Sequence, residues 1–540
     1  MVNGMHIHEE RKAHYYERGH WQTRTVYETF LKAVQSNPTQ VAVIDPYRSI
    51  TYEQLRTFST EIANGFLVKG LKKGDVVSVQ LPNWIEYVAI YLACTKIGVI
   101  FTPIPVNATA KEVANMFTIS RPALHISARH FRKKAYEPML NEVAHSVKLP
   151  DVYLLEQEGE SVQDRRFLPF HLLPVDKNMD APDVHADDHL VILFTSGTES
   201  LPKGVVHTHN TVLFGEKAMQ KALHITEDDR VFMASPLSHA TGFLHAVNLP
   251  LITGATSVLM DHFQGEKAVR VIERQKCTFS MGAATFVHDI LKAIQQQGNP
   301  GALSTLRFFL CGGAPIPRHL VDEAKENGFR LLSVYGASES PPHAISCLHD
   351  SEEWVSQTDG QVLEGIDAKV VGDDRKSLAT DEIGELATRG PNVFIGYYND
   401  PSLTRQYLDE RGWYYSGDLG TLDSDRYVRV VGRKKDMIIR GGQNISPVEV
   451  ENLLLQHASI KEVALVGVPD ERMGEKACAF ITLNPNGTFT YEMMVTYLEE
   501  QNVAKYKWPE YIELVPELAR TASGKIQKFR LLEQWKTKIV

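Results

Sequence analysis

The sequence has little cysteine and no excess of basic charge. An odd, scattered set of cysteines without a Cys-x-x-Cys pair argues against a disulfide framework and a zinc site. The five are Cys94, Cys277, Cys311, Cys347 and Cys478. The formal net charge is −9 at pH 7, and the one tight basic run, 433–435, is too short to follow a nucleic-acid duplex. We therefore expect no nucleic-acid partner.

A long uninterrupted hydrophobic run is also missing. The most apolar stretch, 87–106, contains Lys96, Pro103 and Pro105, and the first ten residues are polar. These features argue against a transmembrane segment and against a signal peptide. The sequence therefore predicts a cytoplasmic protein.

The strongest chemical signal is the segment 195–204, Thr-Ser-Gly-Thr-Glu-Ser-Leu-Pro-Lys-Gly, which follows an apolar strand-like run. Glycines and hydroxyl groups can wrap an anion closely, and Lys203 adds a positive charge. Pro202 and Gly204 depart from the Walker A pattern, which argues against a Ras-type NTPase. The segment predicts a pyrophosphate-binding loop, although an ordinary Gly/Ser-rich surface loop is the alternative that it leaves open. Its predicted nucleotide contacts are Thr195, Ser196, Gly197, Thr198 and Lys203.

The length and the pattern of apolar residues indicate at least two domains. A helix-like segment, 83–96, leads through Gly98 into a strand-like run, and such alternations recur to about residue 370, as in a mixed α/β architecture. Ser446 and Glu449 have the spacing of a capping box at the start of a later helix. Strand-like and helix-like runs follow it, which indicates a small α+β module of about 100 residues.

Five further motifs follow the loop in a fixed order. They are Tyr-Gly-Ala-Ser-Glu at 335–339, Gly-Glu-Leu-Ala-Thr-Arg-Gly at 384–390, Tyr-Ser-Gly-Asp at 415–418, Gly-Arg-Lys-Lys-Asp at 432–436 and Thr-Ala-Ser-Gly-Lys at 521–525. Together with the loop, they resemble the adenylate-forming family of acyl-CoA synthetases, adenylation domains and luciferases, from about residue 25 to the end. The runs at 236–245, 308–313 and 504–507 are most similar to short- and medium-chain fatty-acid CoA ligases. The region of His20 and Trp21 also resembles aryl-acid and cyclohexanecarboxylate ligases.

The resemblance implies a fold and a reaction. The fold is α/β: a large N-terminal domain of mixed sheets and helices, residues 1–433, and a small mobile α+β C-terminal domain, residues 434–540, with a hinge at Lys435. In the reaction, ATP and a carboxylic acid give acyl-AMP and pyrophosphate, and CoA then takes the acyl group. Positioned cations lower the barrier of the first step. The family's matching lysine is Lys525, and Mg²⁺ is expected on Glu339 and Thr195.

The resemblance also assigns residues to the nucleotide and to CoA. Tyr335 is expected to stack on adenine, Asp418 to accept hydrogen bonds from the ribose hydroxyls and Arg433 to add a second ribose or phosphate contact. Gly441 is expected to lie beside the pantetheine arm after the small domain rotates. The remaining predicted nucleotide contacts are Gly313, Ala314, Gly336, Ala337 and Ser338.

The acid is expected to be apolar. His239 and Ala240 match the family segment that lines the acyl pocket, and alanine offers no hydrogen-bond partner to a polar substrate group. A medium-chain fatty acid or an alicyclic acid fits this expectation. His239 is a candidate gate of the pocket, and a half-buried structural histidine is the alternative.

Other classes of function stay open at this point. A stand-alone enzyme that loads a separate carrier protein would make the same adenylate, and a luciferase-like oxygenase would start from it. A non-catalytic acyl or nucleotide sensor should have lost at least one of Lys203, Glu339, Asp418 and Lys525, and all four are present. A homodimer is a further expectation.

Overall fold

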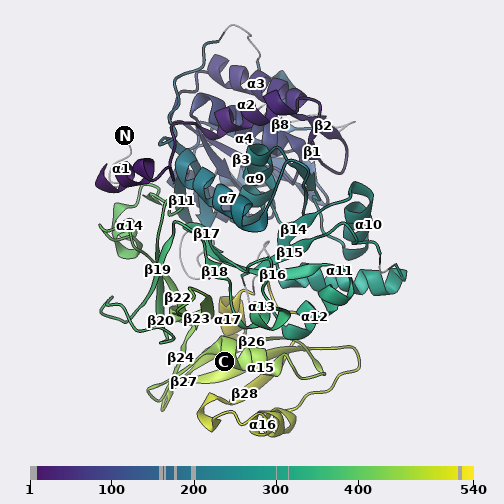
Figure 1. Cartoon of the computed structure of the whole chain (residues 1–540), viewed down its shortest axis with the longest axis vertical. Helices are drawn as coiled ribbons and strands as arrows, with labels where there is room; N and C mark the ends of the chain where they lie inside the picture. The colour runs from purple at the N-terminus through teal and green to yellow at the C-terminus, as the bar shows by residue number, and fades with distance from the viewer. Residues whose placement is uncertain are drawn as a thin grey trace.

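The structure is a computed structural model that describes residues 9–156, 162, 164, 166–174, 179–195, 202–299, 301–313, 316–520 and 526–539. Figure 1 shows the early part of the chain at one end of the molecule and the C-terminal part at the other. The predicted residues Ser196, Gly197, Thr198, Ala314 and Lys525 lie outside the described residues.

Two large sheets form the main body of the described chain. In the first sheet, β12 to β16 run parallel to one another. Its strands, in spatial order, are β18 (Gln361–Val362), β17 (Ser340–Ile345), β16 (Arg330–Ala337), β15 (Phe308–Gly312), β14 (Phe279–Gly282), β12 (Arg230–Met233), β13 (Thr256–Leu259), β1 (Val41–Ile44) and β2 (Ser49–Thr51). Those of the second are β21 (Gly396–Tyr397), β11 (Lys203–Thr208), β10 (His189–Thr195), β4 (Ile100–Pro103), β3 (Val76–Gln80), β5 (Leu124–Ala128), β8 (Asp151–Leu155) and β9 (Leu168–Pro169).

Helices connect and cover these strands, as expected for parallel sheets. They are α1 (Glu9–Glu17), α2 (Val26–Ser36), α3 (Tyr52–Val68), α4 (Ile85–Ile97), α5 (Ala110–Ser120), α6 (Tyr136–Val143), α7 (His209–Leu223), α8 (Ala240–Gly242), α9 (Leu249–Thr253), α10 (Gly265–Gln275), α11 (Ala284–Gln297), α12 (Arg318–Glu326), α13 (Glu352–Gln357) and α14 (Pro401–Tyr407). A π-helix, Phe243–Asn248, joins α8 to α9. A two-stranded ribbon, β6 (His130–Phe131) and β7 (Lys134–Ala135), precedes α6.

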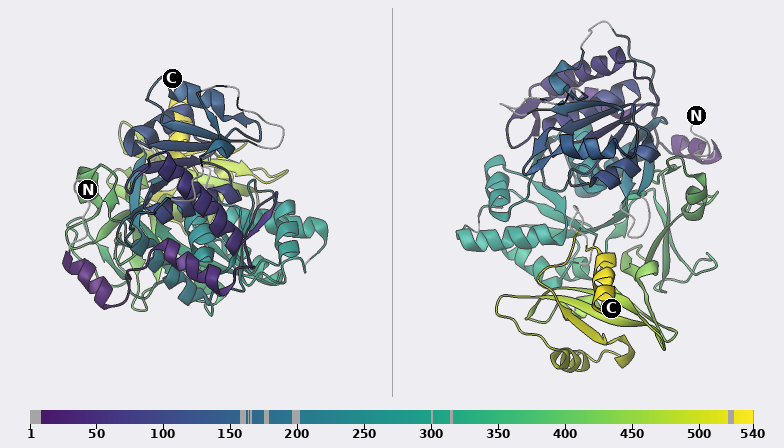
Figure 2. Two further views of the ribbon diagram at one scale, coloured as in Figure 1. Left: turned by 90° about the horizontal axis from the view of Figure 1, so that it is seen from above. Right: turned by 180° about the vertical axis from the view of Figure 1, so that it is seen from behind.

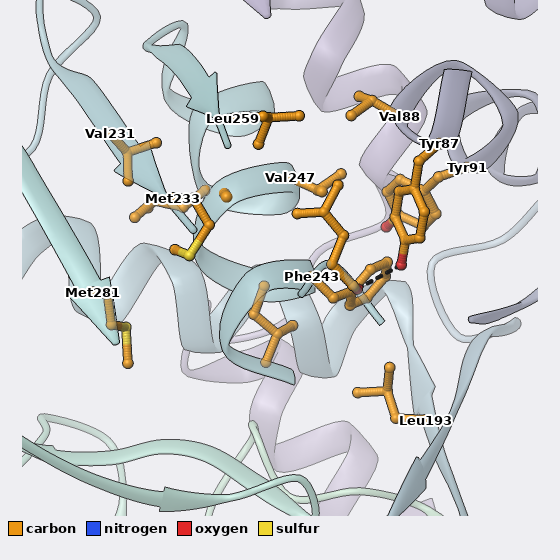
Figure 3. Close-up of a cluster of buried hydrophobic side chains, with 14 of the residues drawn as sticks. Tyr87, Val88, Tyr91, Leu193, Val231, Met233, Phe243, Val247, Leu259 and Met281 are labelled. Atoms are coloured by element: carbon orange, nitrogen blue, oxygen red, sulfur yellow. Dashed lines mark hydrogen bonds between the residues drawn. The ribbon is translucent and has the colours of Figure 1, made fainter. Parts of the chain in front are cut away.

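Helix α4 lies in the centre of the main core. It is apolar on nearly every side, and Gly98 ends it in the left-handed conformation (φ 69°), so the predicted order of helix, glycine and strand is confirmed. The ring of Tyr91 lies 5.3 Å from Phe101 of β4 and 4.9 Å from Phe243 of the π-helix, between centroids. Figure 3 shows this cluster of buried side chains. The helix therefore joins the second sheet to the segment that connects β12 and β13.

A third, antiparallel sheet precedes the C-terminal domain. It contains β19 (Asp367–Val371), β20 (Gly384–Arg389), β22 (Tyr414–Leu422) and β23 (Val428–Arg433). The C-terminal sheet contains β25 (Gln443–Ile445), β24 (Ile438–Arg440), β27 (Gly474–Leu483), β26 (Ile460–Asp470) and β28 (Tyr511–Leu514), and its helices are α15 (Pro447–Leu454), α16 (Tyr491–Glu500) and α17 (Lys528–Ile539). Its buried side chains form clusters separate from the main core. Figure 2 shows α17 in yellow beside this sheet.

The capping box predicted at the start of α15 is half formed. The hydroxyl of Ser446 accepts a hydrogen bond from the Glu449 amide at 3.4 Å. The Glu449 carboxylate instead pairs with Lys507 at 2.6 Å, so an interaction across the domain takes the place of the reciprocal cap.

Gly360 gives a test of the packing at the edge of the first sheet, where it lies directly before β18. Its φ is +100°, and a Cβ there would fall on the backbone of Ile345 and Ser346. Gly328 is a matched control, because its φ is +87° and a Cβ there would meet no atom within 4 Å. We expect Gly328→Ala to cost about 1–2 kcal/mol from backbone strain and Gly360→Ala to cost more, because the neighbouring backbone must also move. Thermal unfolding midpoints compare the two, and equal midpoints would contradict the proposed clash.

Candidate active site

The predicted phosphate loop joins two paired strands. Thr195, the last residue of β10, lies opposite Lys203, the first residue of β11. The loop between them lies outside the described residues. The antiparallel pairing nevertheless fixes both ends of the loop at one edge of the second sheet.

Aromatic rings hold the side chain of Lys203. Its Nζ lies 4.2 Å from the ring centroid of Tyr407 and 5.5 Å from that of Tyr397. An ammonium group over the face of a tyrosine is attracted to the negative face of the ring. The Tyr397 hydroxyl donates a hydrogen bond to Oε1 of Glu339 at 2.9 Å. Lys203 and Glu339, predicted from separate motifs and 136 positions apart, therefore belong to one cluster.

The turn that carries Glu339 is buried and supported from behind. Ala337 pairs with Ser340 across the turn, and Glu339 is 8% exposed. Nε2 of His207 lies 2.7 Å from the carbonyl oxygen of Ser338. Burial lowers the pKa of His207 to about 4, so the imidazole is neutral near pH 7 and its Nε2–H can donate to that carbonyl. His207 lies on β11 with Lys203, and it ties the phosphate-loop strand to the Glu339 turn.

Asp418 is the centre of a second group of contacts. It is buried, and its Oδ2 accepts a hydrogen bond from the Tyr335 hydroxyl at 3.0 Å. Its Oδ1 pairs with Nε of Arg433, opposite it on β23, at 2.9 Å. The charge of Asp418 raises the pKa of Arg433, and burial raises the pKa of Tyr335 well above its usual value. Three residues predicted to bind the nucleoside thus contact one another directly.

Tyr414 lies between these two groups. Burial raises the pKa of its hydroxyl well above the ordinary value, and the charges of Glu339 and Asp418 raise it further. The residue begins β22, the strand that carries Asp418. The ring of Phe394 lies 5.0 Å from that of Tyr397 and 5.5 Å from that of Tyr414, between centroids, so packed aromatic rings connect the strand of Asp418 to the cluster of Glu339.

Two predicted residues lie at the edge of this arrangement. Gly313 follows β15 with φ +87°, a conformation that favours glycine. His239 is the N-cap of α8, where its Nδ1 accepts a hydrogen bond from the Thr241 amide at 3.3 Å. The contact places the ring beside Ala240, and the gating role of His239 stays a prediction.

The residues predicted to serve the second step lie in the small domain. Lys435 is in a 3-10 turn, 434–436, directly after β23. Gly441 has φ +56° in the turn between β24 and β25, and a Cβ there would lie 2.5 Å from Cε of Met473. Beside it is an open cavity of about 730 Å³, which is lined by Arg440, Pro469, Asp470, Glu471, Arg472, Met473 and Lys476.

The sequence motifs did not reveal several residues that shape the site. Tyr397, Tyr407 and His207 are outside the motifs, and an isolated tyrosine or histidine usually reads as a core residue. A sequence signal was available only for His207, which stands four residues after Lys203 on the same strand and so shares its face. Over the described residues, no helix has both the length and the apolar character needed to cross a membrane.

Comparisons with known proteins identify the family of the chain. Residues 30–398 match the family described as AMP-binding enzyme, and residues 449–525 match the AMP-binding enzyme C-terminal domain. A medium-chain fatty-acid–CoA ligase of Escherichia coli is 40% identical over 97% of this chain and 93% of its own length.

Two solved structures are also similar to the whole fold. ATP-bound MatB from Rhodopseudomonas palustris has a TM-score of 0.86 at 25% identity and covers 95% of this chain and 99% of its own. The anthranilate CoA ligase AuaEII in complex with anthranoyl-AMP has a TM-score of 0.86 at 25% identity, over 96% of this chain and 98% of its own. The chain therefore belongs to the AMP-binding enzymes, the adenylate-forming family that includes the acyl-CoA synthetases.

Proposed function

We propose that the protein joins a medium-chain carboxylic acid to CoA. In the first step a carboxylate oxygen attacks the α-phosphorus of ATP, and pyrophosphate leaves. In the second step the CoA thiol attacks the acyl carbon, loses its proton and expels AMP. The observation that carries the proposal is the grouping of Lys203 and Glu339 around Tyr397 with the ion pair of Asp418 and Arg433, because together they supply cations and acceptors for a nucleoside polyphosphate.

The donor set suits the metal that accompanies ATP. Glu339 offers a hard carboxylate, and Oε1 is already oriented by Tyr397. In the described part of the chain, Oε2 accepts no hydrogen bond, so one oxygen is available to a cation. A bound Mg²⁺ would neutralise charge on phosphate oxygens there. We assign Thr195, at the end of β10, as the second contact.

The nucleoside end can bind ribose without losing the hydrogen bonds that Asp418 already accepts. Both carboxylate oxygens of Asp418 have partners, one from Tyr335 and one from Arg433. A carboxylate has about four acceptor positions, so two ribose hydroxyls can bind Asp418 while these partners stay in place. In this arrangement Tyr335 and Arg433 fix the orientation of the acceptor before the nucleotide arrives.

The acyl chain length is carried over from the relatives. The E. coli relative is named for medium-chain fatty acids, and Ala240 offers no polar side chain beside the expected pocket. A separate carrier protein remains the alternative acceptor, because the adenylation step is the same for both. A homodimer stays a prediction.

The open cavity beside Gly441 is our candidate for the CoA phosphates. Lys476 pairs with Asp470 at 2.6 Å, and Arg440 pairs with Glu510. Among the described residues, Arg472 makes no ion pair, so its guanidinium is available for a phosphate.

The overall proposal is tested by product analysis. We expect ATP-dependent pyrophosphate release to peak at saturated acids of about eight to twelve carbons and to rise when CoA is added, with acyl-CoA as the product. The series runs from two to sixteen carbons and includes benzoate, cyclohexanecarboxylate and amino acids. Release that does not respond to CoA, with no acyl-CoA formed, would refute the CoA ligase and favour a carrier protein.

The position of Lys203 gives a second prediction. Tyr407→Leu removes the ring face under the ammonium, whereas Tyr407→Phe keeps it. Because a cation–π contact contributes about 0.5–1 kcal/mol at an accessible site, we expect the leucine variant to raise the KM for ATP about two- to fivefold. The phenylalanine variant should stay near the parent value, with similar KM for the acid in all three. Equal KM values for ATP in the two variants would contradict a positioning role for the ring.

The two-step assignment gives a third prediction. Lys525→Ala should abolish acyl-AMP formation and largely spare thioester formation from supplied acyl-AMP, because its charge acts only on the first transition state. Lys435→Pro should do the reverse, since proline restricts the backbone rotation at the proposed hinge. Measuring both half-reactions in both variants separates the roles, and equal loss of the two steps in Lys525→Ala would refute the assignment.

A further inference from the structure

A carboxylate and an imidazole form a pair inside the main body. Oε2 of Glu216, on α7, lies 3.1 Å from Nδ1 of His245, in the π-helix. The Glu216 side chain is fully buried, and that of His245 is 4% exposed. The pair makes no contribution to the nucleotide cluster described above. Its place in the interior therefore needs a separate physical reason.

The pair has an unused hydrogen-bond acceptor. Oε1 of Glu216 is buried and has no hydrogen-bond partner among the described residues. Native proteins rarely leave such an atom without a donor, because its desolvation is not compensated. Nε2 of His245 likewise has no hydrogen bond to the described residues. Two polar atoms of one buried pair are thus open to an additional group.

The other polar groups of this helix are satisfied within the protein. Asn248 donates a hydrogen bond from Nδ2 to the carbonyl of Phe243 at 3.0 Å, across the π-helical turn. The Tyr91 hydroxyl donates to Oδ1 of Asn248 at 2.6 Å. Among these polar groups of the described chain, the atoms left without a hydrogen bond therefore belong to Glu216 and His245. Local π-helical turns are also frequent at functional sites.

The pair lies between two segments of the candidate active site. The helix that contains His245 begins beside His239 and Ala240, the segment expected to line the acyl pocket. On the other side, α7 packs closely on β17: a Cβ at Gly215 would lie 2.6 Å from the carbonyl oxygen of Pro341, two residues beyond Glu339. The neighbouring side chains Phe243 and Val247 are apolar (Figure 3). The buried polar pair is thus packed between the segment expected to line the acyl pocket and the strand that follows Glu339.

We propose that Glu216 and His245 bind a hydroxyl group on the acyl chain, so that the preferred acid is a medium-chain hydroxy acid. The inference rests on the proposed acid–CoA ligase function. A carboxylate oxygen only accepts hydrogen bonds, so the ligand group at Oε1 must be a donor, as a hydroxyl is and a ketone is not. The acid that carries a carbonyl in place of the hydroxyl is therefore the control, because it has nearly the same shape and cannot donate a hydrogen bond.

A substrate series on the unmodified protein tests the proposal. It compares kcat/KM for decanoate with that for 3-, 5-, 7-, 9- and 10-hydroxydecanoate and for the oxo acids at the same positions except the last. We expect one hydroxy isomer to exceed decanoate at least tenfold, and its oxo counterpart to show no such gain. If every hydroxy isomer falls below decanoate, the proposal is wrong. Turnover of decanoate with CoA in the same series tests the ligase function separately.

Variants test whether the preference for a hydroxy acid comes from Glu216 and His245. Replacing both members by apolar residues, Glu216→Leu with His245→Phe, removes the buried pair without leaving half of it, which proteins often tolerate. We expect this double variant to reverse the ratio, so that decanoate is preferred over the best hydroxy acid. Ser257→Ala is the matched control, because that hydroxyl already donates to the Ala246 carbonyl at 2.7 Å and its loss should leave the ratio unchanged. An unchanged ratio in a folded double variant would overturn the assignment. The single substitution Glu216→Gln keeps shape and polarity, and we expect it to raise the KM for the hydroxy acid more than that for decanoate.

Discussion

The hydrogen bond from Tyr397 to Glu339 connects the two large sheets at the candidate active site. Tyr397 belongs to β21, which extends the second sheet because it pairs with β11, the strand of Lys203. Glu339 lies in the turn between β16 and β17 of the first sheet. The side chain of His207 makes a second connection, from β11 to the same turn. Because both connections are buried, the spacing between the phosphate loop and the proposed metal ligand is set by packing of whole sheets.

The third sheet adds the residues proposed to bind the nucleoside to this frame. Asp418 and Arg433 are partners across β22 and β23, so the register of one antiparallel pair fixes their ion pair. The proposed hinge follows Arg433 directly, and a rotation at Lys435 would leave that pair intact. The pairs of Lys434 with Asp373 and Glu385 likewise join residues on the same side of the hinge. A contact that does span the hinge is the hydrogen bond from the Ser446 hydroxyl to the Val431 carbonyl, and a rotation at Lys435 would have to break it.

The sequence was most informative where chemistry imposes a motif. Lys203, Glu339, Asp418 and Arg433 come from four separate motifs, and the structure brings the first two together around Tyr397 and pairs the last two directly. The helix, glycine and strand around Gly98 were also predictable, because hydrophobic pattern and a C-terminal glycine act locally. Tyr397 and Tyr407 were not, since their role depends on how β21 and α14 fold over β11. The reciprocal cap at Ser446 failed for a similar reason, because Lys507 attracts Glu449 from elsewhere in the domain.

The pair of Glu216 and His245 lay furthest from sequence prediction, and the proposal made for it concerns specificity. The two residues are separated by 29 positions and meet through the packing of α7 against the π-helix. An apolar pocket distinguishes acids by chain length weakly, since one methylene group changes binding by about 1–3 kcal/mol. A buried acceptor that needs a donor discriminates far more strongly, because an acid without the hydroxyl leaves that acceptor unpaired. Under this proposal, the position of one hydroxyl group has a larger effect on which acid is activated than the length of the acyl chain has.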